Sequence, residues 1–515
     1  MVVSRAGVGN WKDAGKSMDS MLLADRPRVD NATGPGSRNA RRDPLPIGSP
    51  RVESRGLPMF QRRRFLFALL FGNASRGWGP SPLSEGGAAE VVGQPDPAKG
   101  EAGSPRAAPA DALLDELGRK ALGWLLTFRN PRSGLVLDRA RHDAPVAVRF
   151  DKPEMASIAS TGYFLSLLPE MERLGLLSGA DAQSLAAETI STIDKRLEGV
   201  HGLYYHFVDW RSGTRWNDCE VSVLDSAILL NGVMVASSAF GDPISESADR
   251  ILNRANWAAF VHRDRGRSLL TLGSHPRRGQ LGPADVASSE MAMAYFLATG
   301  CPNGVSAECW YATRIERGVV AGIDVLNPSH PLFTSYYGMG WHDLEGIVDR
   351  RGLDLFSEAG KAVLANIRFC EEEGKRERTY SGSEGGWIGI SAGDSPIGYR
   401  APKCVAGDPD GVVWPMTFLA ALPWADDVLR DRLPRWKASA AWHVASGPFG
   451  LRPFRLGERP WHADDLIGID VGSFAVSLAN HRNRTVWRHW MRHPIAVAAY
   501  QRLGLVRSKR NTSNT

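Results

Sequence analysis

The sequence predicts an all-α fold in which about a dozen helices pack around one another. Apolar residues recur at helical spacing along most of the chain from Asp111 onward, and strand-like segments are short and confined to connections. Several predicted helices are apolar on almost every face, a pattern typical of buried helices. Such helices favour concentric packing over an exposed solenoid, and the sequence has no clear fixed-period repeat.

The first 110 residues are expected to be a disordered leader, because they are rich in Pro, Gly, Ser and Arg and contain one short apolar run. They hold 16 of the 62 Lys and Arg and 10 of the 56 Asp and Glu, which leaves 46 residues of each sign from residue 111 onward. The formal net charge of +6 therefore lies in the leader. The neutral remainder does not indicate a nucleic-acid partner. Residues 506–515 are expected to be a disordered tail.

Residues 59–77 of the leader contain Arg62-Arg63-Arg64-Phe65-Leu66 followed by an apolar segment that ends at Phe71. This order resembles a twin-arginine export signal, and the alternative is a chance basic and apolar patch. A signal would direct the protein to the periplasm or out of the cell, whereas without one it would be cytoplasmic. We expect no membrane-spanning helix, because no uninterrupted apolar run reaches roughly 20 residues.

The folded domain is expected to span residues 111–505. Its first helix follows from apolar positions between Leu113 and Phe128 and ends at Asn130-Pro131. Besides the helix that follows Glu220, the pattern predicts helices over residues 157–174, 181–197, 244–260, 287–299, 305–319, 333–348, 356–372, 414–421, 425–444, 469–481 and 485–503.

The stretch from residue 204 to 230 joins an aromatic, strand-like segment to the most apolar of these helices, through a turn at Ser212-Gly213. The start of this helix carries three acids, Asp218, Glu220 and Asp225. Glu290 lies in the first turn of a second, nearly uncharged helix. Such carboxylates either cap the helix amides or line a cavity, since a buried charge needs a partner. Two acids that open buried helices among aromatic side chains indicate a pair facing one cleft.

Many of the 16 Trp residues lie in connections, next to charged side chains. Indole faces stack on the C–H faces of sugars, and sugar hydroxyls need fixed carboxylate and guanidinium partners, so a Trp-lined acidic cleft suits a glycan. The alternative is that Trp fills the helical core, which we expect for Trp124 and Trp257. Four others lie beside turns and charges and are expected at the cleft: Trp216, Trp341, Trp387 and Trp414.

The five cysteines form no CxxC pair and leave one unpaired, which argues against a disulfide framework or a zinc site. The Gly-rich segment at residues 380–399 has no phosphate-binding pattern, so its glycines indicate turns.

These segments resemble the bacterial glucoamylase-like proteins that include the endo-β-1,2-glucanases of glycoside hydrolase family 144. The likeness covers residues 111–505 and rests on several short motifs in family order. They are Gly134-Leu-Val-Leu-Asp138-Arg139, Tyr205-His-Phe-Val-Asp209, Ser212-Gly-Thr-Arg215, Glu220-Val-Ser-Val-Leu-Asp225, Glu290-Met-Ala-Met-Ala-Tyr295, Trp341-His-Asp343, residues 387–399, Asp410-Gly411 and Ile469-Asp470-Val-Gly472.

The resemblance implies an (α/α)6 toroid whose aromatic-rich loops frame a sugar-binding cleft, and an inverting glycoside hydrolase without metal or cofactor. Family acids map by motif onto Glu220, near Asp218, and onto Glu290. We expect Glu220 and Glu290 to be the catalytic pair, their acid and base roles unassigned, with Asp218 and Asp225 holding protons or polarising water. The candidate substrate-binding residues are Asp138, Arg139, Asp209, Arg215, Trp216, Tyr337, Trp341, Asp343, Trp387, Asp394, Tyr399, Trp414 and Asp470.

The expected function is hydrolysis of a β-glucan with β-1,2 linkages, on an oligo- or polysaccharide partner, and the sequence specifies neither endo or exo mode nor oligomeric state. A transglycosylase or a lyase on the same toroid is one alternative. A lyase acting on uronic acids needs a basic cleft, which a neutral domain does not indicate. A non-catalytic glycan-binding protein is another alternative, and it would tolerate the loss of the acids.

Overall fold

The computed structural model describes residues 107–143, 148–402 and 410–508. The twin-arginine segment and residues 1–106 of the expected leader lie outside the described residues, as do residues 509–515 of the expected tail. The first described helix, α2, begins at Ala107, a few residues inside the expected leader. At the other end, strand β21 (Val506–Arg507) pairs with β13 (Ile347–Val348), so the start of the expected tail is part of the fold.

The described residues form fourteen α-helices, which carry most of the ordered secondary structure. They are α2 (Ala107–Thr127), α3 (Ile158–Arg173), α4 (Gly179–Lys195), α5 (Val223–Phe240), α6 (Ile244–Arg254), α7 (Ser289–Gly300), α8 (Glu308–Tyr311), α9 (Leu355–Glu373), α10 (Pro415–Leu419), α11 (Leu422–Ala438), α12 (Trp442–Ala445), α13 (Gly468–Asn483), α14 (Thr485–Arg492) and α15 (Pro494–Leu503).

Strands are two to four residues long, and their pairings are antiparallel. Besides β13 and β21 they are β1 (Arg139–Arg141), β2 (Met155–Ser157), β3 (Gly199–Val200), β4 (Leu203–Tyr204), β5 (Phe207–Asp209), β6 (Val221–Ser222), β7 (Val261–Asp264), β8 (Arg267–Leu270), β9 (Gly273–His275), β10 (Gly279–Gln280), β11 (Arg317–Val320), β12 (Ile323–Leu326), β14 (Gly393–Ser395), β15 (Gly398–Arg400), β16 (Ser446–Gly447), β17 (Gly450–Leu451), β18 (Phe454–Arg455), β19 (Trp461–His462) and β20 (Asp465–Ile467). As predicted, they connect helices and build no core of their own.

Two of the predicted helices are wrong. Over 305–319 only the short α8 forms, because Val319 and Val320 instead enter the hairpin of β11 and β12, whose turn uses the positive φ of Gly322. Over 333–348 the chain forms two 3-10 helices, Leu332–Ser335 and Tyr337–Gly340. A Cβ at Gly338 would lie 2.0 Å from the carbonyl oxygen of Ser289, so this glycine lets the segment pack directly on α7.

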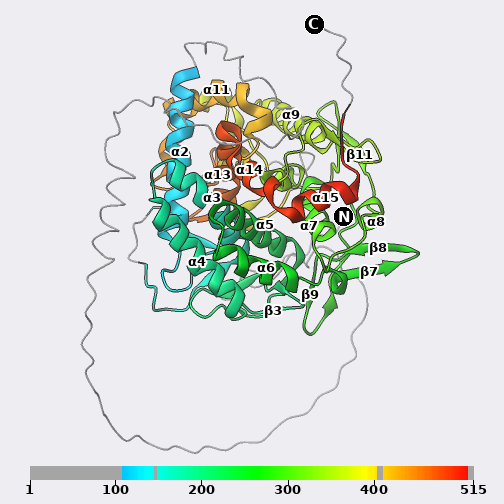
Figure 1. The fold of residues 1–515 in the computed structure, drawn as a ribbon. Coiled ribbons are helices and arrows are strands. Elements are labelled where there is room, and N and C mark those ends of the chain that lie inside the picture. The colour runs from blue at the N-terminus through cyan, green and yellow to red at the C-terminus, as the bar shows by residue number, and fades with distance from the viewer. Residues whose placement is uncertain (1–106, 144–147, 403–409, 509–515) are drawn as a thin grey trace, which may run out of the picture. The chain divides into compact units, whose positions relative to one another are not determined.

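Helices α3, α5, α7 and α13 are buried along most of their length and form an inner layer, whereas α2 lies at the left edge of the molecule in Figure 1. Helix α3 contacts α5 and α13, and α5 also contacts α7. On the outside, α2 packs on α13, α4 on α3 and α6 on α5. The inner helix α5 is long and apolar enough to cross a membrane by length and composition alone, but 72% of it is buried inside the fold. Its apolar surface is therefore explained by its place in the core.

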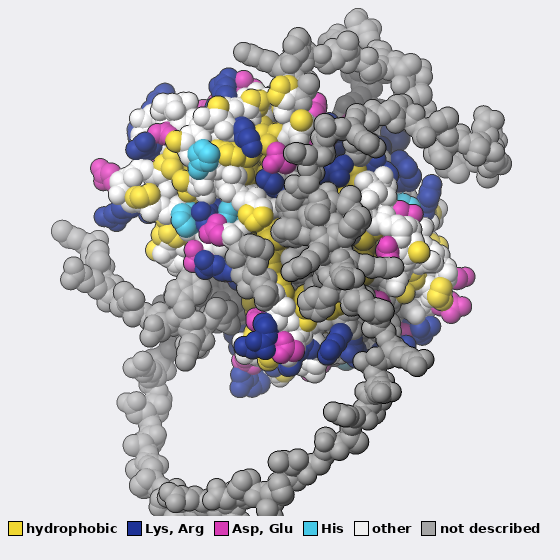
Figure 2. Space-filling view, turned by 90° about the vertical axis from the view of Figure 1, so that its left-hand side faces the viewer, with side chains coloured by type: hydrophobic (Ala, Val, Ile, Leu, Met, Phe, Trp, Pro, Cys, Tyr) yellow, Lys and Arg dark blue, Asp and Glu magenta, His cyan; other side chains and the backbone are white. Residues whose placement is uncertain are grey.

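Opposite charges are interspersed over the face of the molecule that Figure 2 draws, where Lys and Arg side chains lie among Asp and Glu. Charged side chains also form ion pairs elsewhere in the described part of the chain, such as Arg250 with Asp194 and Arg317 with Glu358. This agrees with the balance of charges that the sequence gives from residue 111 onward.

Two glycines bring α3 and α5 close together. A Cβ at Gly162 would lie 2.4 Å from the carbonyl oxygen of Ile228, and one at Gly232 would lie 2.2 Å from the carbonyl oxygen of Gly162. Both obstacles are backbone atoms, which cannot turn aside as a side chain can. The close approach sets the position of the start of α5, where Asp225 lies.

We expect Gly232→Ala to lower the free energy of unfolding by about 1–3 kcal/mol, the usual cost of overpacking, although alanine is the better helix former. Gly118→Ala in α2 is the matched control, because its Cβ would meet only the movable Cδ2 atom of Leu478 at 2.5 Å. Urea denaturation of both variants measures the difference. An equal loss in the two variants would show that backbone contact at Gly232 is not the limiting feature.

Candidate active site

Three inner helices begin with a carboxylate in the first turn: Asp225 in α5, Glu290 in α7 and Asp470 in α13. Serine hydroxyls cap the first two helices, since Oγ of Ser222 accepts from the amide of Asp225 at 3.1 Å and Oγ of Ser288 accepts from the amide of Met291 at 3.1 Å. A cap satisfies an amide that would otherwise lack a partner. Glu290 is therefore not needed as the cap of α7, and its carboxyl is available for another role.

Two of these carboxyls are held in the neutral form. Burial and the nearby charge of Asp225 raise the pKa of Glu290 to about 8. Burial, together with the charges of Asp394 and Asp138, raises the pKa of Asp470 to about 8. Both groups therefore keep their protons at neutral pH, as a proton donor must.

Glu220 has the opposite character, because His206 binds it. Nδ1 of His206 lies 2.9 Å from Oε1 of Glu220, and Nε2 lies 3.5 Å from Oδ2 of Asp225. Burial alone would raise the pKa of Glu220, but the hydrogen bond and charge of His206 hold it below its usual value. Glu220 and Glu290 are thus linked through His206 and Asp225, with one carboxyl ionised and the other protonated.

His206 is a residue that sequence analysis missed. The chain turns at Gly213, and Tyr205 forms a bridge opposite Val221, so that the amide of His206 donates to the carbonyl oxygen of Glu220 at 2.9 Å. The signal was present in the sequence: positions 206 and 220 are equally far from Gly213, and a hairpin centred there pairs them.

Arg139 joins two more of the predicted binding residues. Its Nε atom lies 3.0 Å from Asp138, and its Nη1 atom lies 3.0 Å from Asp394. The indole of Trp414 donates to the carbonyl oxygen of Asp394 at 3.1 Å and so holds the start of β14 in place. The structure therefore brings Asp138, Arg139, Asp394 and Asp470 together, since Asp138 and Asp394 both raise the pKa of Asp470.

Tyr399 is a half-exposed aromatic residue beside these acids. It lies opposite Asp394 in the β14–β15 hairpin, and 47% of the residue is exposed. Desolvation, and after it the charges of Asp470, Asp138 and Glu290, raise the pKa of its hydroxyl. The hydroxyl end of the Tyr399 side chain therefore lies near these acids. A half-exposed ring next to fixed carboxylates suits a sugar.

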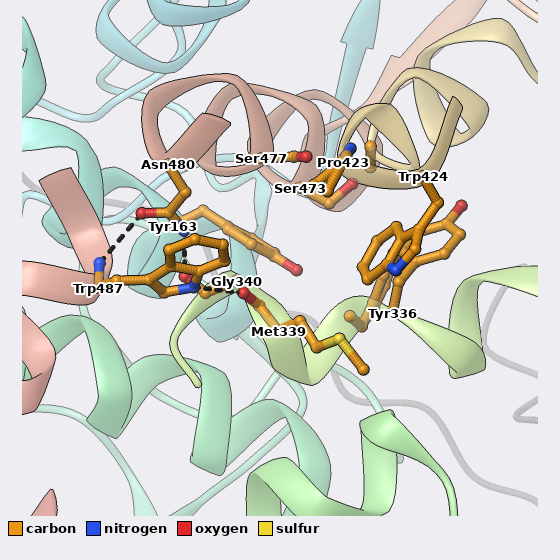
Figure 3. Close-up of a pocket in the computed structure, with 12 residues that line it drawn as sticks. Tyr163, Tyr336, Met339, Gly340, Pro423, Trp424, Ser473, Ser477, Asn480 and Trp487 are labelled. Carbon is orange, nitrogen blue, oxygen red and sulfur yellow. Dashed lines mark hydrogen bonds between the residues drawn. The ribbon is translucent and has the colours of Figure 1, made fainter. Parts of the chain in front are cut away.

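A cavity lies between α3, α13 and the segment from Tyr336 to Gly340 (Figure 3). Tyr163 and Tyr337 line it, and the charge of Asp470 contributes, after burial, to raising the pKa of both phenols. The hydroxyl of Tyr163 points into the cavity (Figure 3), and among the described residues neither it nor the hydroxyl of Ser477 has a hydrogen-bond partner. Buried hydroxyls of this kind are usually satisfied by water.

Four other predicted site residues also form ion pairs or hydrogen bonds within the protein. Asp218 is about half exposed and forms ion pairs with Arg277 and Arg215. Arg215 also donates through Nε to the carbonyl oxygen of Cys219 at 2.7 Å. Asp209 accepts from the amide of Arg211 in a turn, and Asp343 pairs with Arg484. Asp218, Arg215, Asp209 and Asp343 stay predicted site residues, and each of them has a protein partner in this structure.

The expectation that Trp341, Trp387 and Trp414 line the cleft needs correction. All three are fully buried and present no face to a sugar. Trp341 packs on Tyr163 and donates to Oγ of Ser166 at 2.9 Å, whereas Trp387 stacks on Trp436. The prediction rested on the turns and charged residues next to these Trp residues in the sequence. Such neighbours do not show whether an indole is buried or exposed. Trp216 is partly exposed and stays a candidate.

The inner helices carry the acids at their first turns, and the outer helices pack around them. Residues 285–494 match the Glycoamylase family model, which is described as "Putative glucoamylase". The sequence-based resemblance to glucoamylase-like proteins is confirmed by this match.

Among known proteins, the exo β-1,2-glucooligosaccharide sophorohydrolase (non-reducing end) of Parabacteroides distasonis is 20% identical over 439 residues, which is 76% of this chain. The chain spans 58% of the length of that relative.

Solved structures give the same fold. An endo-β-1,2-glucanase from Chitinophaga pinensis, in complex with sophorotriose and glucose, superposes with a TM-score of 0.67 at 18% identity, over 77% of this chain and 98% of that one. A β-1,2-glucanase from Parabacteroides distasonis also gives 0.67 at 18% identity, over 76% of this chain and 60% of that one. The predicted all-α toroid is therefore confirmed.

Proposed function

We propose that this protein is a glycoside hydrolase that cleaves a β-glucan, with β-1,2-linked glucan as its substrate. One observation carries the proposal: Glu290 lies in the first turn of the buried helix α7, close to Asp225, which His206 joins to a second carboxyl, Glu220. Burial and the charge of Asp225 raise the pKa of Glu290 to about 8, as a proton donor requires. The relatives named above support the linkage, because their names specify β-1,2-glucans or β-1,2-glucooligosaccharides.

The proposed reaction is single displacement with inversion. Glu290 gives its proton to the leaving glycosidic oxygen while the bond from that oxygen to C1 breaks. A water molecule attacks C1 from the opposite face, and Glu220 takes the proton that this water loses. In inverting enzymes the two carboxyls lie about 6.5–9.5 Å apart, which leaves room for that water.

The remaining members of the cluster bind the sugar in this proposal. Arg139 is held in place by its ion pairs with Asp138 and Asp394. The guanidinium offers hydrogen-bond donors to sugar hydroxyls, and the two carboxylates offer acceptors. The ring of Tyr399 is available for stacking on a glucose face.

A panel of linear glucans that differ only in linkage tests the function. We expect reducing sugar to appear from β-1,2-glucan and not from β-1,3- or β-1,4-glucan, and proton NMR to show the α-anomer as the first product. Unsaturated products would identify a lyase, and longer oligosaccharides formed by sugar transfer would identify a transglycosylase. Binding of every glucan without any cleavage would identify a binding protein.

We also propose that the chain is exported, on the basis of Arg62-Arg63-Arg64-Phe65-Leu66 and the apolar residues that follow. N-terminal sequencing of the protein from its native cells tests this. A processed N-terminus after residue 71 would support export, and an N-terminus before residue 59 would contradict it.

A further inference from the structure

His206 lies between two acids of the cluster and contacts both. Its Nδ1 atom is 2.9 Å from Glu220 and its Nε2 atom is 3.5 Å from Asp225. The ring also stacks on Phe207, with centroids 3.9 Å apart and planes 15° apart. The imidazole is therefore held at both nitrogens and on one face.

The charges around His206 favour its protonated form. An imidazole carries a proton on both nitrogens only as imidazolium, and here each nitrogen faces a carboxylate oxygen. Burial lowers the pKa of His206, but the charges of Asp225, Glu220 and Asp138 outweigh burial and bring it to about 9. Arg278 adds a second positive charge that acts on Glu220. His206 is thus a positive group within a set of acids that come from different segments.

We infer that His206 is a positioning residue for the proposed hydrolysis: its imidazolium bridges Glu220 and Asp225, keeps Glu220 ionised and fixes the orientation of both carboxylates. The inference rests on the proposed function, in which Glu220 accepts a proton from water. Asp225 contacts His206, and its charge also acts on Glu290 and raises the pKa of that carboxyl. The bridge therefore fixes the charge that favours the protonated form of Glu290.

The pH dependence of kcat/KM separates this role from a merely structural one. His206→Asn keeps a hydrogen-bond donor near Glu220 but removes the positive charge. The acidic limb of the profile reports the ionisation of Glu220, and it should then move to higher pH by about one to three pH units. The reason is that His206 lowers the pKa of Glu220 by about this amount, and without its charge burial raises that pKa. His262→Asn, in strand β7, is the matched control and should leave the profile unchanged.

A superimposable profile for wild type and His206→Asn, with reduced kcat at every pH, would overturn the positioning role. His206→Gln places the same kind of donor on a longer side chain, and it should show the same upward shift of the acidic limb. Agreement between the two variants rules out a loss of folding particular to one of them.

NMR titration of the His206 ring tests the bridge without using activity. In the wild-type protein the ring should titrate near pH 9, and in Glu220→Gln and Asp225→Asn the midpoint should fall as one negative charge is lost. A midpoint unchanged in both variants would refute the bridge. If the wild-type protein cleaves no glucan, the proposed function fails, whereas the titration still decides whether His206 pairs with these acids.

Discussion

Glu290→Gln is expected to lower kcat on linear β-1,2-glucan by about 10²–10⁴-fold, the usual contribution of a general acid. Glutamine keeps the size and the hydrogen-bonding capacity of the side chain but carries no proton to give to the leaving oxygen. KM should change little, because the proton is needed in the transition state and not for binding. Reducing-sugar release by purified wild type and variant measures the effect.

The same substitution should make the protein more stable at neutral pH. The pKa of Glu290 rises from 4.5 to about 8 on folding, so between these values the folded state binds more protons than the unfolded state. The stability that this shift contributes is complete below about pH 4.5 and is lost as pH rises through about 8. Glutamine does not ionise, so the Tm of the variant should exceed that of the wild type increasingly across this window.

Glu246→Gln is the matched control for both measurements, because Glu246 lies in the first turn of the outer helix α6 and is exposed. It should leave kcat unchanged and lower Tm slightly, by the same amount at every pH above about 5, because an acid in the first turn of a helix contributes about 0.3–1 kcal/mol. Wild-type turnover in Glu290→Gln would remove Glu290 from the mechanism and leave Asp470, whose pKa is also raised to about 8, as the remaining neutral acid of the cluster.

Trp387→Ala is expected to lower the free energy of unfolding by about 3–5 kcal/mol, as for other large buried aromatic residues. Its indole stacks on that of Trp436 with centroids 4.5 Å and planes 7° apart, and Phe454 meets it edge-on at 4.8 Å. Truncation leaves a cavity that this rigid set of rings cannot fill. Chemical denaturation measures the loss, and KM for glucan should be unchanged where the variant is folded.

Trp461→Ala, at a partly exposed indole in β19, should cost clearly less. A raised KM in Trp387→Ala with unchanged stability would return Trp387 to the sugar-binding surface, as the sequence analysis had placed it. The two measurements together decide between a core and a cleft residue.

The secondary structure was predictable wherever one helix face, or the whole helix, is apolar. Helices α3, α5, α9 and α13 follow from this pattern because burial of apolar surface dominates their formation. The segment at 333–348 is different, since Gly338 and Gly340 give it contacts with α7 and α13 that no local pattern specifies. The hairpin of β11 and β12 forms around a single tight turn. The apolar spacing of this segment also fits a helix, so the spacing alone did not predict the hairpin.

Sequence by itself determined the helical class, the neutral folded domain and the acids that begin buried helices, because composition and periodicity are properties of single segments. Only the tertiary structure decided which acids meet, which Trp residues are buried and that His206 lies between Glu220 and Asp225. The reason is that a carboxyl pKa and the exposure of an indole depend on neighbours from other segments, such as Asp225 beside Glu290 and Trp436 against Trp387.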